Sequence, residues 1–201
     1  MKYRLLCSLV AAGLLTSCSN KPTTITEMEA FIEEPDNNLI QAKNRDGLLV
    51  EVKFQPSSLL AARELQQIQA TTTQRDSIRG KYQLYSSFLL TFSKENKEVT
   101  SQNASFSSYS QLVQVLSFKM GQYVHLTTSL GDTLHPVACV FDRTYGLDDR
   151  SRVLVVFPKK NQGTEQYITI KEFGLACGDM RFSVNADAMH QISDSNLQLI
   201  D

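Results

Sequence analysis

The densest group of residues able to do chemistry lies between positions 142 and 152, where three aspartates alternate with three arginines. Paired carboxylates can bind calcium or act as general acid and base. The spacing differs from that of an EF-hand loop, and the interleaved arginines favour mutual neutralisation on a solvated loop. If this loop is functional, docking to a partner is favoured over catalysis. The six residues are Asp142, Arg143, Asp148, Asp149, Arg150 and Arg152.

The histidines offer little support for catalysis or metal binding. His125, His135 and His190 are the only three, and none stands in His-x-x-x-His or His-x-His spacing. A zinc site would therefore have to be assembled from distant segments. The serines form no Gly-x-Ser-x-Gly elbow. We predict no cofactor, no metal and no enzymatic activity. One alternative stays open, an envelope hydrolase or metal-dependent enzyme that combines the 142–152 loop with a histidine.

Two of the four cysteines, Cys139 and Cys177, lie well inside the chain. In an oxidising compartment they could form a disulfide between a predicted strand and a predicted loop. They could equally be free cysteines that behave as small buried hydrophobes. Their positions in the sequence do not place the two sulfurs within bonding distance, so both readings stay open.

The first residues of the chain have the organisation of a secretory signal. Lys2 and Arg4 are basic, and residues 5–15 are apolar but too few to span a bilayer stably. Leu15-Thr16-Ser17-Cys18 resembles the lipobox of bacterial lipoproteins. The resemblance implies a type II signal peptide that is cleaved before Cys18. It also implies acylation of the Cys18 thiol and of the new amino group, which anchors the chain durably.

These features predict both a layout and a location. Residues 1–17 are the signal peptide, residues 18–24 the lipidated cysteine and its tether, and residues 25–201 a single globular β-rich domain. Ser19, rather than Asp, follows Cys18, which resembles the signal for the outer membrane in enteric bacteria. No acid-rich export tag follows, so we expect an outer-membrane lipid anchor with the domain facing the periplasm.

The charge balance excludes one class of partner. Removal of the signal peptide takes two basic residues from the 20 in the chain, so 18 basic residues face 21 acidic ones and the formal charge is about −3. A nucleic-acid binder would show a basic patch or a basic excess. We therefore predict no nucleic-acid partner.

Helical signals occur in a few stretches. Residues 26–32 begin with a cap and an acidic first turn, and Pro35 stops them. Apolar residues recur with helical spacing in 57–70 and in 109–116. A further helical turn is predicted over 76–82.

Strand patterns are more numerous. Residues 48–54 alternate after an Asp-Gly turn and are predicted to form a hairpin with 39–43. Residues 123–128 and 133–141 predict a second hairpin, with Pro136 at an edge. Further strands are predicted over 86–93, 166–171 and 180–184, and the unbroken apolar run 153–157 suits a central strand. About seven or eight strands with two or three helices favour an α+β, mainly β class, an antiparallel sandwich-like domain.

Taken whole, the chain resembles the small uncharacterised lipoproteins of Bacteroidota. The likeness rests on the lipobox, the short tether, and a domain that opens Glu-Glu-Pro-Asp-Asn-Asn-Leu-Ile and continues Val-Lys-Phe-Gln-Pro. The resemblance implies a location in the cell envelope and no known activity. We expect a non-enzymatic binding or structural component of an envelope assembly, such as a secretion machine, held to the membrane by lipid and bound to an envelope protein. A small-ligand binder is a further alternative, which requires a cavity.

Overall fold

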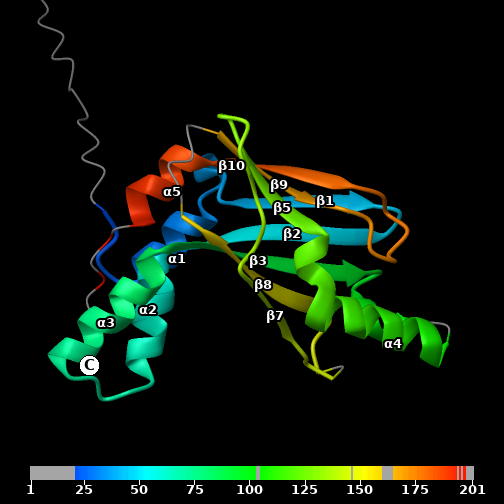
Figure 1. Ribbon diagram of the computed structural model, residues 1–201, viewed down its shortest axis with the longest axis horizontal. Helices are drawn as coiled ribbons and strands as arrows, with labels where there is room; N and C mark the ends of the chain where they lie inside the picture. Colours follow the sequence, from blue (N-terminus) through cyan, green and yellow to red (C-terminus); the bar gives the residue numbers. More distant parts are fainter. Residues whose placement is uncertain are drawn as a thin grey trace, which may run out of the picture.

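The computed structural model describes residues 21–102, 105–145, 147–159, 165–193, 195 and 197. Within these residues, ten strands form two antiparallel sheets and helices gather at both ends of the sheets (Figure 1). The α+β sandwich-like class is therefore confirmed. The described chain has ten strands and five α-helices, where the sequence predicted about seven or eight strands and two or three helices.

The larger sheet, sheet A, has the strand order β1-β2-β3-β8-β7, and a short strand, β4, pairs with β3. β1 and β2 form the predicted hairpin, because Asp46 and Gly47 both adopt the positive φ angles that a tight two-residue turn requires, +52° and +78°. The strands are β1 (Ile40–Arg45), β2 (Leu48–Gln55), β3 (Tyr85–Lys94), β4 (Lys97–Glu98), β7 (Ala138–Asp142) and β8 (Ser151–Pro158).

The smaller sheet, sheet B, has the order β10-β9-β5-β6. The single strand predicted over 133–141 is wrong, because β6 pairs with β5 in sheet B while β7 pairs with β8 in sheet A. Pro136 lies between them and has no N–H for a ladder, so the chain leaves one sheet and enters the other there. The strands are β5 (Val124–Thr128), β6 (Thr133–Leu134), β9 (Glu165–Ile170) and β10 (Met180–Asn185).

Three of the helices begin with a capping box, in which the cap and the third helical residue satisfy each other's N–H groups. The caps are Thr24 for α1, Thr71 for α3 and Ser105 for α4. The α-helices are α1 (Ile25–Glu33), α2 (Ser57–Gln66), α3 (Thr72–Gln83), α4 (Phe106–Gln114) and α5 (Ala186–Ser193). Shorter turns are η1 (Pro35–Asn37), η2 (Val99–Gln102), the π-helical η3 (Val115–Lys119) and η4 (Met120–Gln122).

One hydrophobic core lies between the inner faces of the two sheets. Phe88 on β3 packs against Phe54 and Phe157 of the neighbouring strands, with ring centroids 5.5 and 6.1 Å apart. Phe92 meets Phe173, which follows β9, edge to face at 5.4 Å. The core extends to α1 through Met28 and to α5 through Ile192, among others. Burial of this apolar surface is the main force that holds sheets and helices together.

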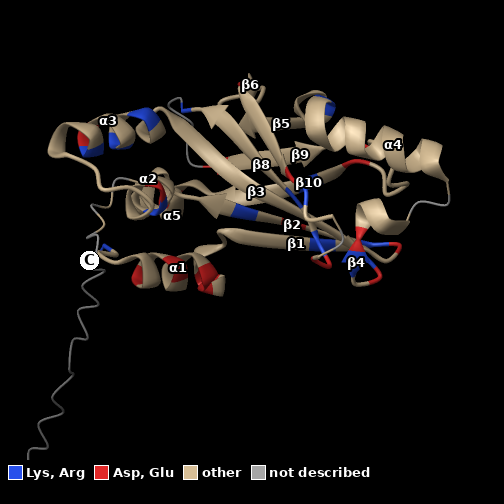
Figure 2. Cartoon of the chain, turned by 90° about the horizontal axis from the view of Figure 1, so that it is seen from below, with Lys and Arg blue, Asp and Glu red and all other residues tan. Residues whose placement is uncertain are grey.

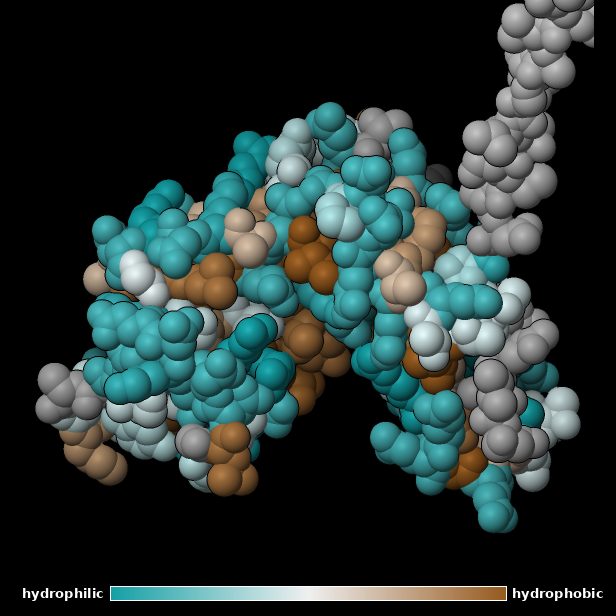
Figure 3. Space-filling view, turned by 180° about the vertical axis from the view of Figure 1, so that it is seen from behind, coloured by the Kyte–Doolittle hydropathy of each residue, from teal (hydrophilic) through white to brown (hydrophobic). Residues whose placement is uncertain are grey.

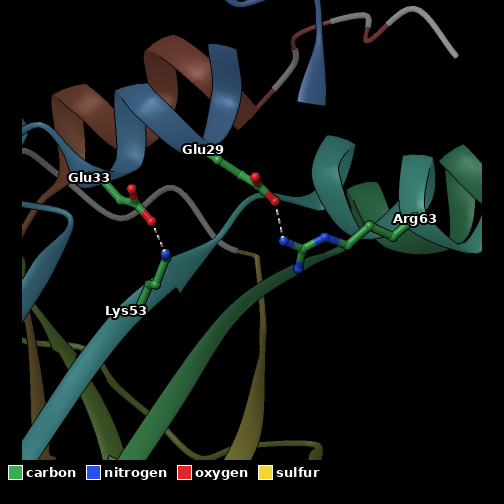
Figure 4. Close-up of polar contacts among 4 residues, drawn as sticks. All are labelled: Glu29, Glu33, Lys53 and Arg63. Atoms are coloured by element: carbon green, nitrogen blue, oxygen red, sulfur yellow. Dashed lines mark hydrogen bonds and ion pairs between the residues drawn. The ribbon is translucent and has the colours of Figure 1, made fainter. Parts of the chain in front are cut away.

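The helices are distributed unevenly. α1, α2, α3 and α5 lie at one end of the sheets and α4 at the other (Figure 1). Two ion pairs fasten α1, from Glu29 to Arg63 of α2 at 2.6 Å and from Glu33 to Lys53 of β2 at 3.2 Å (Figure 4). Acidic residues occur along α1, whereas α3 carries mostly basic ones (Figure 2). Among the described residues, no helix is both long and apolar enough to cross a membrane.

Candidate functional site

The outer face of sheet A, which points away from sheet B, carries an apolar row across four strands. The strand register places Lys53, Leu89, Leu154 and Val140 side by side in that order. Directly opposed residues in an antiparallel sheet share a face, so their side chains contact one another. This row is therefore apolar over three strands and basic at the fourth.

Of the two neighbouring rows on this face, one is partly apolar and the other is charged. Val156 and Ala138 lie next to each other in the row toward α2 and α3. The row toward the 142–152 loop is charged, and consists of Glu51, Thr91, Arg152 and Asp142. We call the five apolar residues of this face the sheet A patch: Leu89, Ala138, Val140, Leu154 and Val156.

The sheet A patch is open to solvent. Val140 is 58% exposed, and Leu89, Leu154 and Val156 are half-buried. Seen from behind, the molecule is hollowed between two projections, and hydrophobic residues are visible in the hollow (Figure 3). A concave apolar surface with a polar rim is typical of a site that binds a protein or an apolar ligand.

The residues 153–157 explain how this patch arises. Their unbroken apolar run predicted a central strand, and β8 is flanked by β3 and β7. Val153, Val155 and Phe157 point into the core and are fully buried, which leaves Leu154 and Val156 on the outer face. Sequence reasoning missed the patch because it assumed burial of both faces of this strand, as in a sheet covered on both sides.

The charged loop between β7 and β8 is occupied by its own ion pairs. Arg152 binds the Asp148 carboxylate, and Arg150 approaches Asp149 at 3.5 Å. Asp148 Oδ1 also accepts the backbone N–H of Arg150 at 3.1 Å. The bond from Arg152 lowers the pKa of Asp148, with a further contribution from Asp149. The predicted neutralisation of aspartates by arginines is therefore confirmed for these four residues.

The other two members of the loop set have different surroundings. Asp142 ends β7 and lies in the charged row beside Arg152. The Arg143 guanidinium lies over the ring of Tyr145 at 5.3 Å from its centroid, a cation–π contact. Of the six loop residues, Asp142 and Arg152 therefore border the sheet A patch, whereas Arg143 and Tyr145 line a small cavity with Phe141 and Val113.

The histidines lie on elements other than this loop: His125 in β5, His135 just after β6 and His190 in α5. Partial burial lowers the pKa of His125, and the nearby Lys171 and His135 lower it further. Over the described ranges, no group of three or more histidine, cysteine or carboxylate side chains is placed to hold a metal ion.

The disulfide alternative for the two internal cysteines is wrong, since both thiols are free in this structure. Cys139 lies on β7 in sheet A, whereas Cys177 lies in the loop between β9 and β10 of sheet B. Burial raises the pKa of each thiol to about 11. A raised pKa leaves little thiolate at neutral pH, and the thiolate is the form that attacks electrophiles and binds metals.

Cys18, the predicted lipidation site, lies outside the described residues, as does all of the predicted signal peptide. Of the predicted tether, Lys21 to Thr24 are described, and they lead directly into α1. Lipidation stays a prediction from the sequence.

Comparison with known proteins yields similarities to solved structures only. No protein-family model matches the chain, and no curated protein does. A crystal structure of a novel protein of unknown function from Burkholderia pseudomallei K96243 aligns over 86% of this chain and 90% of its own, with 10% identity and a TM-score of 0.41. A DUF4426 family protein from Pseudomonas aeruginosa PAO1 aligns over 73% of this chain and 92% of its own, with 14% identity and a TM-score of 0.39.

Proposed function

We propose that this protein is a non-enzymatic docking component of an envelope assembly, anchored in the outer membrane through Cys18 and facing the periplasm. The observation that carries the proposal is the sheet A patch, an apolar surface in a hollow whose rim is charged. Its occupant is a protein partner that supplies an apolar strip flanked by polar groups. Such a surface would give affinity through the apolar centre and orientation through the rim.

The charges of the rim support a protein partner. Glu51, Arg152 and Asp142 alternate in sign along the row beside the patch, and Lys53 ends the apolar row. A surface of mixed sign with no net excess suits a polypeptide with complementary side chains and does not suit a polyanion. Because Asp148 already pairs with Arg152, the rim is ordered before a partner arrives, which reduces the entropy lost on binding.

The tether supports a position close to the membrane. Six residues, 19–24, separate Cys18 from the start of α1 at Ile25, a reach of about 25 Å when fully extended. In this proposal the end with α1, α2, α3 and α5 faces the lipid, and α4 and the charged loop point away from it. The sheet A patch would then lie within reach of another envelope protein.

The experiment is an affinity pull-down from gently solubilised membranes with Val140→Glu. A carboxylate within an apolar interface is costly to bury, so recovery of a stoichiometric partner should fall at least tenfold. Leu130→Glu is the matched control, because Leu130 is 69% exposed in the turn between β5 and β6 of sheet B and is not part of the patch. Thermal unfolding of both variants should match the wild type within a few degrees.

The anchor is tested in the same experiment with Cys18→Ala, retained in the periplasm by an ordinary signal peptide. Partners recovered with the lipidated form alone would support an assembly at the membrane. Equal recovery with Val140→Glu and with Leu130→Glu would refute the sheet A patch as the docking surface. Failure of every form to recover a partner would remove the basis of the proposed function.

A further inference from the structure

A second site lies at the opposite end of the molecule, in a cavity of about 250 Å³ between α2, α3 and the chain after α5. These elements lie side by side at the end away from α4 (Figure 1). The volume is just below the ~300–1,000 Å³ of pockets for drug-sized ligands, so it suits a smaller molecule. The lining residues that matter for its chemistry are Ser57, Ala61, Leu65, Arg79, Ser195 and Leu197.

The polar side of the cavity holds two groups without a partner in the described chain. Ser195 is only 6% exposed, and its buried hydroxyl makes no hydrogen bond. Arg79 lines the same cavity and makes no ion pair there, whereas Arg63 and Lys81 nearby are neutralised by glutamates. A buried hydroxyl without a partner costs free energy, and a ligand that supplied an acceptor would remove that cost.

The N-terminus of α2 opens onto the same cavity. Pro56 precedes it and provides no side-chain cap, so the first N–H groups of this ten-residue helix have no side-chain acceptor. The hydroxyls of Ser57 and Ser58 are engaged elsewhere, since they donate to the carbonyls of Ser193 and Ile192 at 3.2 and 3.3 Å. They hold the chain after α5 against α2 and leave the helix N-terminus to an anion.

The remaining wall is apolar, with Ala61 and Leu65 of α2 facing Leu197 across the cavity. We infer that this cavity binds a small organic anion, a carboxylate on a short alkyl chain, with Arg79 and the α2 N-terminus at the carboxylate. Ser195 donates to the carboxylate, and the alkyl chain contacts Ala61, Leu65 and Leu197. An arginine fork matches a carboxylate with two parallel hydrogen bonds. This inference stands on residues separate from the sheet A patch and does not depend on the proposed function.

The test uses the full chain with Cys18→Ala, secreted through an ordinary signal peptide, and hexanoate as the probe in calorimetric titration. Arg79→Gln should weaken hexanoate binding at least tenfold, which corresponds to about 1.4 kcal/mol. Arg75→Gln is the matched control on the same helix, because Arg75 is exposed and its guanidinium binds only the Ala70 carbonyl, at 3.3 Å. Ser195→Ala should also weaken binding, by a smaller factor.

Two further probes, hexanol and inorganic phosphate, test the carboxylate and the alkyl chain separately. Hexanol should bind far more weakly than hexanoate, and equal binding would overturn the anion assignment. Inorganic phosphate should not compete with hexanoate, and full competition would overturn the role of the alkyl chain. Absence of hexanoate binding at millimolar concentration, or equal affinity of Arg79→Gln and wild type, would overturn the site as a whole. Circular dichroism of each variant establishes that it is folded.

Discussion

The Glu172 carboxylate organises the loop between β9 and β10. Its Oε1 accepts the N–H groups of residues 174–176 at 2.7, 2.7 and 3.0 Å, and its Oε2 accepts those of residues 177 and 178 at 2.7 Å each. Gly174, Ala176 and Gly178 all have positive φ, so the backbone curls and directs successive N–H groups inward. This is an anion nest that the protein fills with its own side chain.

Two opposing effects set the pKa of Glu172. Partial burial raises it, but the backbone donors, chiefly Gly174 and Gly178, together lower it from 4.5 to about 2. A carboxylate whose pKa is lower in the folded state stabilises the fold above its unfolded pKa. That stabilisation is therefore complete above about pH 4.5 and is lost as the pH falls toward 2.

We predict that Glu172→Gln lowers the free energy of unfolding by about 1–2 kcal/mol at pH 7, a value reduced for the solvent screening of a partly exposed group. The NH₂ group of the glutamine would lie against the backbone N–H groups of residues 174–178, which are donors as well. The difference from wild type should shrink as the pH falls from 4.5 to 2. Urea unfolding between pH 2.5 and 7 measures this, with Glu34→Gln, an exposed glutamate, as control. A difference that is independent of pH would contradict the nest.

The residue types in the sequence were enough to predict the ion pair in the 142–152 loop, but not the Glu172 nest or the cavity beside α2. Asp148 and Arg152 stand four residues apart in a short charged loop, so their pairing followed from the sequence. Glu172 could not be found in this way, because all its donors are backbone N–H groups. Arg79 and Ser195 are distant in the sequence, and only the packing of α3 against the chain after α5 brings them to one cavity.

At the scale of the elements, α3 depends on local interactions more than its neighbours do. It has no buried residue and packs mainly on α2. Its start is fixed by a capping box, in which Thr71 Oγ1 accepts the Gln74 N–H at 3.4 Å and Gln74 Oε1 accepts the Thr71 N–H at 2.9 Å. A helix with so little burial is expected to open without unfolding the core.

We predict that Thr71→Ala raises amide hydrogen exchange in α3 about fivefold, because loss of an N-cap costs about 1 kcal/mol. Exchange in β3 and β8 should be unchanged, since their amides open with the whole core. Thr73→Ala, an exposed threonine of the first turn, is the control and should have little effect. Faster exchange in every strand would instead mean that α3 folds as one unit with the sheets.

The elements that could be predicted from the sequence are those with a clear local pattern of residues. Alternation identified β2 and β3, because each has one face in the core. The helical turn predicted over 76–82 begins too late, since Thr71 is the cap that starts α3 at Thr72. α5 went unrecognised because it follows β10 directly, without a break. The change of sheet at Pro136 depends on pairing with distant strands, which local pattern does not contain.

At the scale of the whole molecule, side chains join the two sheets where β1 and β10 meet. Lys43 donates to the carbonyl of Arg181 on β10, and Arg45 Nη1 donates to the carbonyls of Cys177 and Asp179 at 2.6 and 3.3 Å. Backbone pairing closes neither edge, since β1 pairs with β2 and β10 with β9. Long basic side chains therefore satisfy carbonyls that would otherwise end a sheet at an open edge.

We predict that Arg45→Met lowers the global free energy of unfolding by about 1–2 kcal/mol, the range for loss of charge-assisted hydrogen bonds. The sheets share one core, so unfolding should remain a single transition with an unchanged denaturant slope. Arg150→Met, which loses a surface ion pair 3.5 Å long, should change stability by less than about 0.5 kcal/mol. Two separate transitions in Arg45→Met would mean that the basic side chains, more than the common core, hold the two sheets together.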